Sequence, residues 1–361
     1  MNRSICLAAL SIAALSAGTV QAQSQSSTQG SSPEFGAPAV YAEDAYAEPV
    51  YEGYEPPRNK WGQPDFSGVW SNGTTTRMER ADAYGDTLIL SEEQARAMQT
   101  RAEKYRASGD TATDPDAPPP SDGNTDLGYN RFWTDPGTQV MRVEGKPRSS
   151  FITYPANGKV PPRRAGAPPP PEAMADSDEA NDEGGRNDNP ESRGLSERCI
   201  FFQTTAGPVK RPVLYNNNYL IVQGKDSVAI VTEMVHTPQV ITLGAKHTNG
   251  GVLSWSGDAI GHYDGDTLVV ETTDFKTHAG FYGASEELTI TERYTRVADN
   301  RLLYQFEVKD PVTWAEPWGG EYEFWVSKGF YEYACHEGNY GMYGILAGGR
   351  QEDAERAASG E

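Results

Sequence analysis

Cysteine, histidine and catalytic signature motifs are all scarce in this chain of 361 residues. There is no CxxC pair, no G-x-S-x-G elbow and no glycine-rich phosphate loop after a strand, which argues against thioredoxin-like, α/β-hydrolase and nucleotide-binding proteins. The histidines show no HxH, HExxH or zinc-finger spacing. They are His236, His247, His262, His278 and His336. We therefore expect no cofactor and no metal, although a site assembled from distant strands would leave no trace in the sequence.

Basic residues are also few relative to acidic ones, 31 against 51, which gives a formal charge of −20. A surface of this charge repels phosphate backbones and anionic lipids, so nucleic-acid and membrane-surface binding are disfavoured. Beyond the first residues, no stretch approaches the roughly 20 apolar residues of a spanning helix. We expect a small-molecule partner and no transmembrane segment. The sequence does not indicate the oligomeric state.

The first 22 residues have the pattern of a secretory signal. Arg3 precedes an apolar run over residues 5–17, and Val20-Gln21-Ala22 offers the small-residue pattern of a cleavage site. We expect cleavage after Ala22 and a periplasmic or secreted protein, an uncleaved anchor being the alternative. Cleavage of the signal peptide would leave two cysteines, Cys199 and Cys335. We expect them to form one disulfide in the oxidising compartment rather than to remain as two buried thiols. Closing so long a loop would stabilise the fold by about 4–5 kcal/mol.

Composition divides the rest of the chain into one domain and several extensions. Residues 23–57 are rich in Ser, Gln, Ala and Glu and predict a disordered tether, whereas residues 58–350 predict a single β-barrel domain. Within that domain, a proline run and an acidic run predict a disordered insertion at about 160–195, either an inert excursion or a flap. Residues 351–361 are expected to be a flexible tail. Ser91 to Gln94 is a capping box that opens a surface helix over about 92–107.

From residue 198 onward the pattern is one of repeated strands. Leu302, Tyr304, Phe306 and Val308 alternate with polar residues, as in a half-buried strand. Asp264-Gly265-Asp266 and Asp299-Asn300 predict hairpin turns. About ten consecutive strands without a βαβ unit favour a closed barrel, because closure removes exposed edges. The expected fold is mainly β, an antiparallel up-and-down lipocalin-like barrel with one N-terminal surface helix. A flat sandwich is the alternative.

Four ionisable residues are candidate catalytic groups. Glu292 falls on the apolar face of its strand, where a carboxylate must be paired or have its pKa raised. A salt bridge to a neighbouring arginine such as Arg293 or Arg296 is an equally good interpretation. His336, beside the carboxylate of Glu337 and followed by a glycine-containing run from Gly338 to Gly341, and Glu233 with His236 at a strand end have the composition used for proton transfer near neutral pH. A structural role for these histidines remains open.

The candidate substrate-binding residues are amides and aromatics near strand ends. Asn216 and Asn218, or Asn217 alone, would face a pocket and recognise hydroxyl or carbonyl groups. An Asn-rich turn with left-handed backbone explains the same run equally well. Asn339 and Tyr340 would help to orient the substrate. The expected aromatic wall consists of Trp255, Trp314 and Trp318.

Several long motifs resemble a large family of uncharacterised exported bacterial proteins. The similarity covers roughly residues 60–350, and it implies membership without implying an activity. The strand pattern is more loosely similar to lipocalin-like barrels, which include both carriers and enzymes. The motifs are Trp61-Gly-Gln-Pro-Asp-Phe-Ser-Gly-Val-Trp70, Tyr215-Asn-Asn-Asn-Tyr219, Glu233-Met-Val-His236, Gly265-Asp-Thr-Leu-Val-Val-Glu-Thr272 and Tyr333-Ala-Cys-His-Glu-Gly-Asn-Tyr340.

Three functions are compatible with this sequence. The first is a cofactor-free hydrolase or lyase that acts on a small hydroxylated or aromatic molecule, with His336 and Glu233 as the acid–base pair and Glu292 as the alternative carboxylate. The second is a periplasmic small-ligand binding or carrier protein, and the third is a structural envelope protein. Convergence of Glu233, His236, Glu292 and His336 in an open cavity favours catalysis, because charges within about 6 Å perturb each other's pKa. Dispersal of these groups favours a carrier.

Overall fold

The computed structural model describes residues 47–109, 134, 136–167, 187–207, 209–247, 253–276, 281–327 and 329–359. The expected signal peptide, most of the expected tether and residues 168–186 of the expected insertion lie outside these ranges. Within the described part, no helix is both long and apolar enough to span a bilayer.

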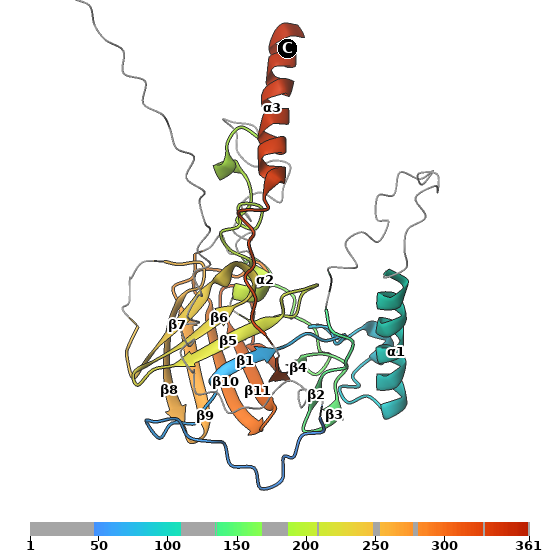
Figure 1. Ribbon diagram of the computed structural model, residues 1–361, viewed down its shortest axis with the longest axis vertical. Coiled ribbons are helices and arrows are strands. Elements are labelled where there is room, and N and C mark those ends of the chain that lie inside the picture. Colours follow the sequence, from blue (N-terminus) through green and yellow to red (C-terminus); the bar gives the residue numbers. More distant parts are fainter. Residues whose placement is uncertain are drawn as a thin grey trace, which may run out of the picture. The chain divides into compact units, whose positions relative to one another are not determined.

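The core of the structure is a closed β-barrel of nine strands (Figure 1). The strands follow the order β1-β5-β6-β7-β8-β9-β10-β11-β12, and β12 pairs with β1 to close the ring. The short strand β4 adds to β12 on one side. The strands are β1 (Gly68–Ser71), β4 (Ile152–Tyr154), β5 (Asn218–Gln223), β6 (Ser227–Thr232), β7 (Pro238–Leu243), β8 (Asp258–Asp264), β9 (Thr267–Thr273), β10 (Thr289–Ala298), β11 (Arg301–Lys309) and β12 (Trp318–Val326). The expectation of a closed barrel is confirmed, and a flat sandwich is excluded.

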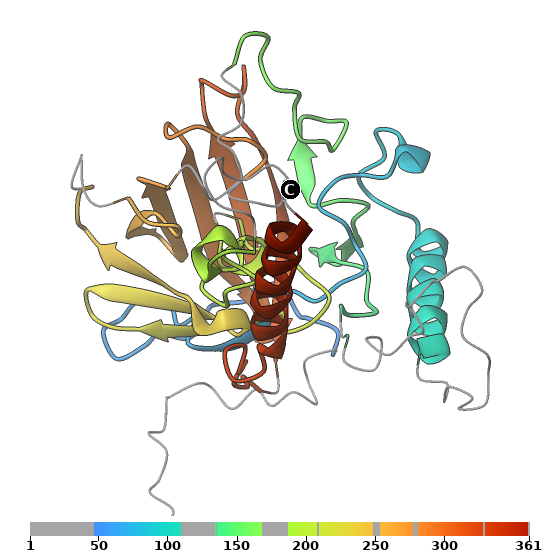
Figure 2. The ribbon, with the colours of Figure 1, turned by 90° about the horizontal axis from the view of Figure 1, so that it is seen from above.

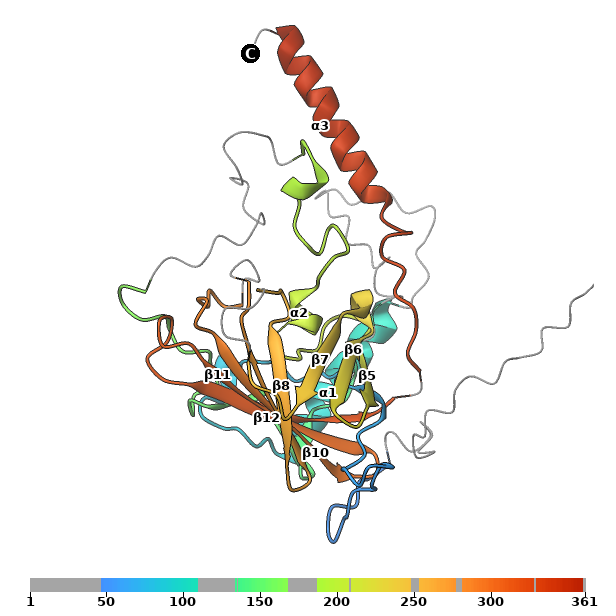
Figure 3. The same ribbon diagram turned by 90° about the vertical axis from the view of Figure 1, so that its left-hand side faces the viewer.

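One pair of neighbouring strands in the ring is parallel. β7 and β8 run in the same direction, with Ile241 opposite Ala259, whereas every other neighbouring pair is antiparallel. A ring with an odd number of strands cannot alternate in direction all the way round, so nine strands require at least one parallel pair. A parallel pair needs a connection that returns to the starting end, and residues 244–257 provide it. Figure 3 shows β5 to β8 side by side on this face of the barrel.

The hairpins form where the sequence predicts them. β8 and β9 meet at Gly265, whose φ of +58° is the left-handed conformation that glycine adopts without a steric penalty. β10 and β11 meet at Asp299-Asn300. Glycine has a second use in β12, where a Cβ at Gly320 would lie 2.0 Å from the carbonyl oxygen of Phe151. The absence of a side chain there lets β4 pair with β12.

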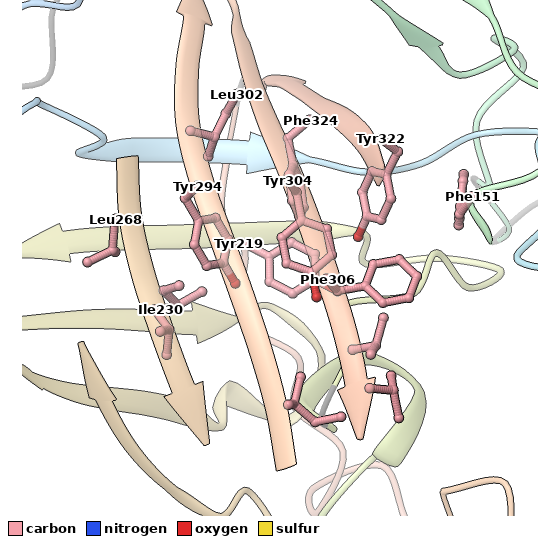
Figure 4. Packing of buried hydrophobic residues seen from close by; sticks show 14 of the residues in the cluster. Phe151, Tyr219, Ile230, Leu268, Tyr294, Leu302, Tyr304, Phe306, Tyr322 and Phe324 are labelled. Carbon is pink, nitrogen blue, oxygen red and sulfur yellow. The ribbon is translucent and has the colours of Figure 1, made fainter. Parts of the chain in front are cut away.

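Aromatic side chains fill the barrel interior (Figure 4). Tyr304 lies at the centre of this cluster, with its ring centroid 5.0 Å from that of Tyr322 and 5.1 Å from that of Tyr294. Tyr219 and Phe324 pack edge to face at 5.4 Å. The alternation seen in the sequence places these residues inside, because successive side chains of a strand point to opposite faces of the sheet. The centre of the barrel is therefore packed rather than hollow.

The helices and minor elements lie outside the barrel ring. They are η2 (Asp82–Tyr84), α1 (Glu92–Gly109), β2 (Arg142–Val143), β3 (Lys146–Pro147), η3 (Pro190–Ser192), α2 (Gln203–Ala206), η4 (Met234–His236) and α3 (Tyr340–Ser359). α1 begins at the predicted capping box: the Gln94 amide donates to Ser91 Oγ at 3.1 Å, and the Ser91 amide donates to Gln94 Oε1 at 2.8 Å. Its residues are mostly exposed, as expected for a surface helix.

Four segments differ from the sequence prediction. Residues 200–203 and 330–334, which lie in the region of repeated strands expected from residue 198 onward and have strand-like sequences, are not strands. α2 begins at Gln203, and the second segment is irregular chain outside the sheet. Residues 351–359, expected as a flexible tail, are the second half of α3. The end of the expected tether packs against the barrel, because the Tyr51 hydroxyl donates to Glu323 Oε2 at 2.8 Å. Such pairings between distant segments leave no local periodicity in the sequence.

Candidate ligand-binding site

One end of the barrel is covered by the chain that links α2 to β5 (Figure 2). The hydroxyls of two core tyrosines hold this segment: Tyr322 donates to the carbonyl of Lys210, and the Lys210 amide donates to the Tyr304 hydroxyl at 3.2 Å. Tyr219 donates to the carbonyl of Thr205 in α2 at 3.4 Å. Tyrosines from β5, β11 and β12 therefore hold the covering chain on the mouth of the barrel.

Glu292 lies at the centre of a buried polar network. Its Oε1 accepts hydrogen bonds from Tyr304 at 2.8 Å and Tyr294 at 3.0 Å, and lies 3.5 Å from Lys210 Nζ. Its Oε2 accepts a bond from Gln239 Nε2 at 3.1 Å, and Lys210 Nζ donates to Gln239 Oε1 at 3.0 Å. The Glu292 side chain is fully enclosed. The salt-bridge interpretation of Glu292 is confirmed, but its partner is a lysine from the covering chain and not Arg293 or Arg296.

The tyrosines of this network remain hydrogen-bond donors. Burial raises the pKa of the Tyr294 and Tyr304 hydroxyls well above the usual value, and the negative charge of Glu292 adds to the increase. Burial likewise raises the pKa of Tyr219 and Tyr322. Every carboxylate oxygen of Glu292 thus has a partner, as a buried charge requires. The arrangement satisfies the carboxylate and leaves it no free lone pair directed into open space.

A pocket of about 690 Å³ lies outside the packed centre, beside the covering chain. Its walls come from residues 74–78, which follow β1, and residues 211–215 of the covering chain. Phe202, Thr204, Met234 and Pro136 complete the lining. This volume is typical of small-molecule sites, which are mostly apolar with a few polar groups. We call this cavity the mouth pocket.

The lining of the mouth pocket contains two arginines and no carboxylate, in a chain with an excess of acidic residues. The guanidinium of Arg211 lies over the rings of Tyr282 at 5.3 Å and Phe281 at 5.9 Å, and its Nη1 donates to the Tyr282 hydroxyl at 3.1 Å. Among the described residues, neither Arg211 nor Arg77 forms an ion pair with a carboxylate. The remaining polar groups of the lining are the hydroxyls of Tyr215 and four threonines, Thr74, Thr75, Thr76 and Thr204. This pocket therefore has positive charge and hydroxyl groups on otherwise apolar walls.

Glu233 and His236 both bind the backbone that follows β12. β6 ends at Thr232, and the chain then turns through η4, with positive φ at Val235 and His236. Glu233 is buried; its Oε1 accepts a bond from the Tyr331 amide at 3.0 Å, and its Oε2 accepts one from Asn218 Nδ2 at 2.6 Å. His236 Nε2 accepts a bond from the Tyr333 amide at 3.0 Å. The turn brings both side chains to one segment, where they hold residues 331–333.

The four expected catalytic groups do not contact one another. In the part of the chain that the structure describes, no hydrogen bond or ion pair joins any two of Glu233, His236, Glu292 and His336. The imidazole of His336 is exposed and has no polar partner among those residues. His336 and Glu233, proposed as an acid–base pair, are not hydrogen-bonded to each other; the carboxylate of Glu233 is bonded to Tyr331 and Asn218.

The asparagine run forms a turn and not a pocket wall. Asn216 has a φ of +54°, and the Asn217 side chain bonds to both backbone groups of Val213, at 2.7 Å and 2.9 Å. Asn218 is bonded to Glu233 and also accepts a hydrogen bond from Ser327 Oγ at 2.7 Å. None of the three lines the mouth pocket. The left-handed turn considered as the alternative is the one observed.

Asn339 and Tyr340 are at the start of α3. Asn339 Oδ1 accepts a bond from the Met342 amide at 3.3 Å, as a helix cap does, and its Nδ2 donates to the Glu197 carbonyl at 2.7 Å. The expected disulfide between Cys199 and Cys335 is present beside it. Tyr340 is 83% exposed. Asn339 and the disulfide thus join the chain before α2 to the chain before α3.

The three tryptophans do not form one wall. Trp314 and Trp318 pack edge to face with centroids 5.6 Å apart, and both are buried. Trp255 has a different environment, 6.3 Å from the ring of Phe201 and 4.7 Å from the ammonium of Lys276. None of the three lines the mouth pocket. Trp255 belongs to the β7–β8 connection, whereas Trp314 lies between β11 and β12 and Trp318 is the first residue of β12.

The basic residues that distinguish this end of the barrel could not be predicted from the sequence pattern. Lys210 and Arg211 belong to a segment without periodicity, so neither was a candidate. One signal was available: Val209-Lys210-Arg211-Pro212 is a basic pair between apolar residues in an acidic chain.

Comparison with protein-family models, with curated protein sequences and with solved structures finds no match for this chain.

Proposed function

We propose that this protein is an exported binding protein or carrier for a small molecule with a mostly apolar body and one anionic group, such as an aromatic or aliphatic carboxylate. The observation that carries the proposal is the mouth pocket, whose lining has Arg77 and Arg211 and no carboxylate. A guanidinium without an acidic partner is a ready site for a bidentate carboxylate or a phosphate. The apolar walls would cover the rest of the ligand.

Binding has more support than catalysis. An acid–base enzyme needs a proton donor and acceptor within hydrogen-bond reach of the reacting atoms. Glu292 is fully bonded inside the barrel, Glu233 holds the backbone of Tyr331, and neither lines the mouth pocket. The hydrolase or lyase hypothesis stays a prediction without a geometric argument in its favour.

Export and the resemblance to exported bacterial proteins are part of the same proposal. The Cys199–Cys335 disulfide supports an oxidising compartment, since structural disulfides persist outside the reducing cytosol. Within this proposal, residues 1–22 are the signal peptide and the barrel is a lipocalin-like carrier fold. Identification of the mature N-terminus by mass spectrometry after expression in a Gram-negative host tests the cleavage after Ala22.

The ligand proposal is tested with matched pairs of probes. Purified protein is screened by thermal shift against aromatic and aliphatic carboxylates and the corresponding neutral amides, and the hits are titrated by calorimetry. We expect the carboxylates to raise the melting temperature and the amides to bind at least about tenfold more weakly, since one lost charged hydrogen bond is worth about 1.5–3 kcal/mol.

Variants assign the binding to the pocket. Arg211→Gln is expected to remove the preference for carboxylates. Arg293→Gln is the control, because Arg293 is on β10 and pairs with Asp264 away from the mouth pocket. Equal binding of amides and carboxylates, or unchanged binding by Arg211→Gln, would show that the charge of this pocket does not select the ligand. Turnover of any probe would restore the enzymatic hypothesis.

A further inference from the structure

A cluster of one imidazole and three carboxylates lies where the β7–β8 connection meets β8 and β9. His247 belongs to that connection, Asp258 is the first residue of β8, and Asp274 directly follows β9. One ligand atom from each of these three residues lies within 4.8 Å of the other two. Glu271, from β9, contacts His247 from the other side. None of these residues lines the mouth pocket.

Both nitrogens of His247 face carboxylate oxygens. Nδ1 is 3.2 Å from Asp258 Oδ2, and Nε2 is 3.2 Å from Glu271 Oε1. A neutral imidazole has a single N–H, so it satisfies only one of these contacts and directs a lone pair at the other carboxylate. A metal ion bound by the nitrogen without a proton would replace this repulsive contact by ligand bonds. Thr273 Oγ1 is also near Nδ1, at 3.3 Å, and donates to Asp274 Oδ2 at 3.0 Å.

The cluster gathers three carboxylates around a single imidazole. Asp258, Asp274 and Glu271 surround one imidazole, and no lysine or arginine of the described chain pairs with any of them. A divalent cation bound by the imidazole would offset two of the three carboxylate charges, and it would replace the contact between Nδ1 and the carboxylates by ligand bonds.

We propose that His247, Asp258 and Asp274 bind a divalent transition-metal ion, Zn²⁺ or Mn²⁺, through Nδ1 and two carboxylate oxygens. A mixed set of imidazole and carboxylate suits these ions better than Ca²⁺, which takes oxygen ligands alone. Glu271 would accept the Nε2–H bond, as the carboxylate behind a metal-bound histidine commonly does. Because the three ligand atoms lie within 4.8 Å of one another, an ion placed between them would be about 2.8 Å from each. Side-chain movements below about 1 Å would shorten these distances to those of zinc ligands.

The position of the site suggests what the ion does. β7 and β8 are parallel, so no tight turn fixes their connection. An ion held by His247, Asp258 and Asp274 would join that connection to the start of β8 and the end of β9. It would stabilise the folded chain in the way that a cross-link closing a loop does. This role is separate from ligand binding in the mouth pocket and does not depend on it.

Titration of metal-free protein tests the proposal. The full chain, purified without a histidine tag and treated with a chelator, is titrated by calorimetry with ZnCl₂, MnCl₂, CaCl₂ and MgCl₂, and its melting temperature is measured with each. We expect one Zn²⁺ or Mn²⁺ per chain, a raised melting temperature, and weaker binding of Ca²⁺ and Mg²⁺. His247→Gln and Asp274→Asn are each expected to weaken binding by about tenfold or more.

The control is His262→Gln, because His262 is an exposed histidine on β8 outside the cluster; it should bind metal as the parent does. Should Asp274→Asn fail to fold, Asp258→Asn carries the same prediction. The proposal is wrong if Zn²⁺ and Mn²⁺ neither bind nor raise the melting temperature, if His247→Gln binds as tightly as the parent, or if Ca²⁺ binds best.

Discussion

The ammonium nitrogen of Lys210 lies 3.5 Å from Oε1 of Glu292, and both side chains are enclosed within the barrel. Lys210 belongs to the covering chain before β5, and Glu292 belongs to β10. The pair therefore connects the chain over the mouth of the barrel to its inner wall. Gln239 and two tyrosines satisfy the remaining polar atoms around the carboxylate.

Removal of one member of this pair should be strongly destabilising. Lys210→Met leaves the Glu292 charge buried without its cation, so we expect the free energy of unfolding to fall by about 3–5 kcal/mol. Urea denaturation followed by tryptophan fluorescence measures this change. The double variant Lys210→Met/Glu292→Gln should be more stable than Lys210→Met, because it removes the uncompensated charge.

Lys309→Met is the control for this prediction. Lys309 pairs with Glu307 on the exposed side of β11, where an ion pair contributes about 0–1 kcal/mol. A loss below about 1 kcal/mol for Lys210→Met would mean that the pair is not the buried contact described above.

Glu233→Gln should loosen the chain that follows β12. Both oxygens of Glu233 accept hydrogen bonds, one from the Tyr331 amide and one from Asn218. In glutamine one of these oxygens is replaced by an NH₂ group, which would face an N–H donor and could not accept its hydrogen bond. We expect faster hydrogen exchange at Tyr331 and a loss of about 1–3 kcal/mol. Glu332→Gln, at an exposed position of the same segment, should leave exchange unchanged. Equal exchange in the two variants would contradict the contact.

Removal of the disulfide should act on the same region of the chain. Cys199→Ser/Cys335→Ser opens a loop with a sequence separation of 136 residues. We expect a loss of about 2–5 kcal/mol, because the unfolded chain gains conformational freedom. Hydrogen exchange should rise in residues 329–339 more than in β9 to β11. An unchanged urea midpoint would contradict this expectation.

Ionisation of Glu323 should lower the free energy of unfolding as the pH rises. The decrease should begin above about 4.3, which is the ordinary pKa of a glutamate. Burial raises the pKa of this carboxyl group, and hydrogen bonds from the Glu144 amide and from Tyr51 only partly offset the increase. The folded state thus holds the proton more tightly than the unfolded state, so the stabilisation is complete at low pH and is lost as the pH rises through the folded pKa.

Glu323→Gln removes this dependence. The difference in unfolding free energy between the parent protein and the variant should therefore change between about pH 4 and neutral pH. As the pH rises, the parent should become less stable relative to the variant. Urea titrations of both proteins across this range measure the change. A constant difference would show that the carboxyl has the same pKa in both states.

The local part of the fold could be predicted from the sequence. Period-two alternation placed Tyr304 and Phe306 inside, Gly265 marked a hairpin, and Ser91 marked the start of α1. Each of these signals lies within a few neighbouring residues, where sequence and conformation are directly coupled. The parallel β7–β8 pair has no such signal, because it arises from closing the whole ring.

The candidate site could be predicted only in part. Glu292 was correctly placed inside, since its position in the alternation determines its face of the sheet. Its partner Lys210 is distant in the sequence and in irregular chain, so composition suggested the nearer arginines instead. His247 and Asp258 likewise meet only through the return of the β7–β8 connection. Contacts set by topology, and not by spacing, account for these omissions.

The pairing of β1 with β12 also governs how the protein has to be assembled. Trp70 pairs with Val326, so the first strand of the ring has to wait for the last one to be synthesised. Hairpins such as β8–β9 need only their immediate neighbours, whereas this seam closes a loop that contains the rest of the barrel. Any fragment that ends before β12 therefore has two bare strand edges, on which copies of the unfinished chain are free to pair with one another.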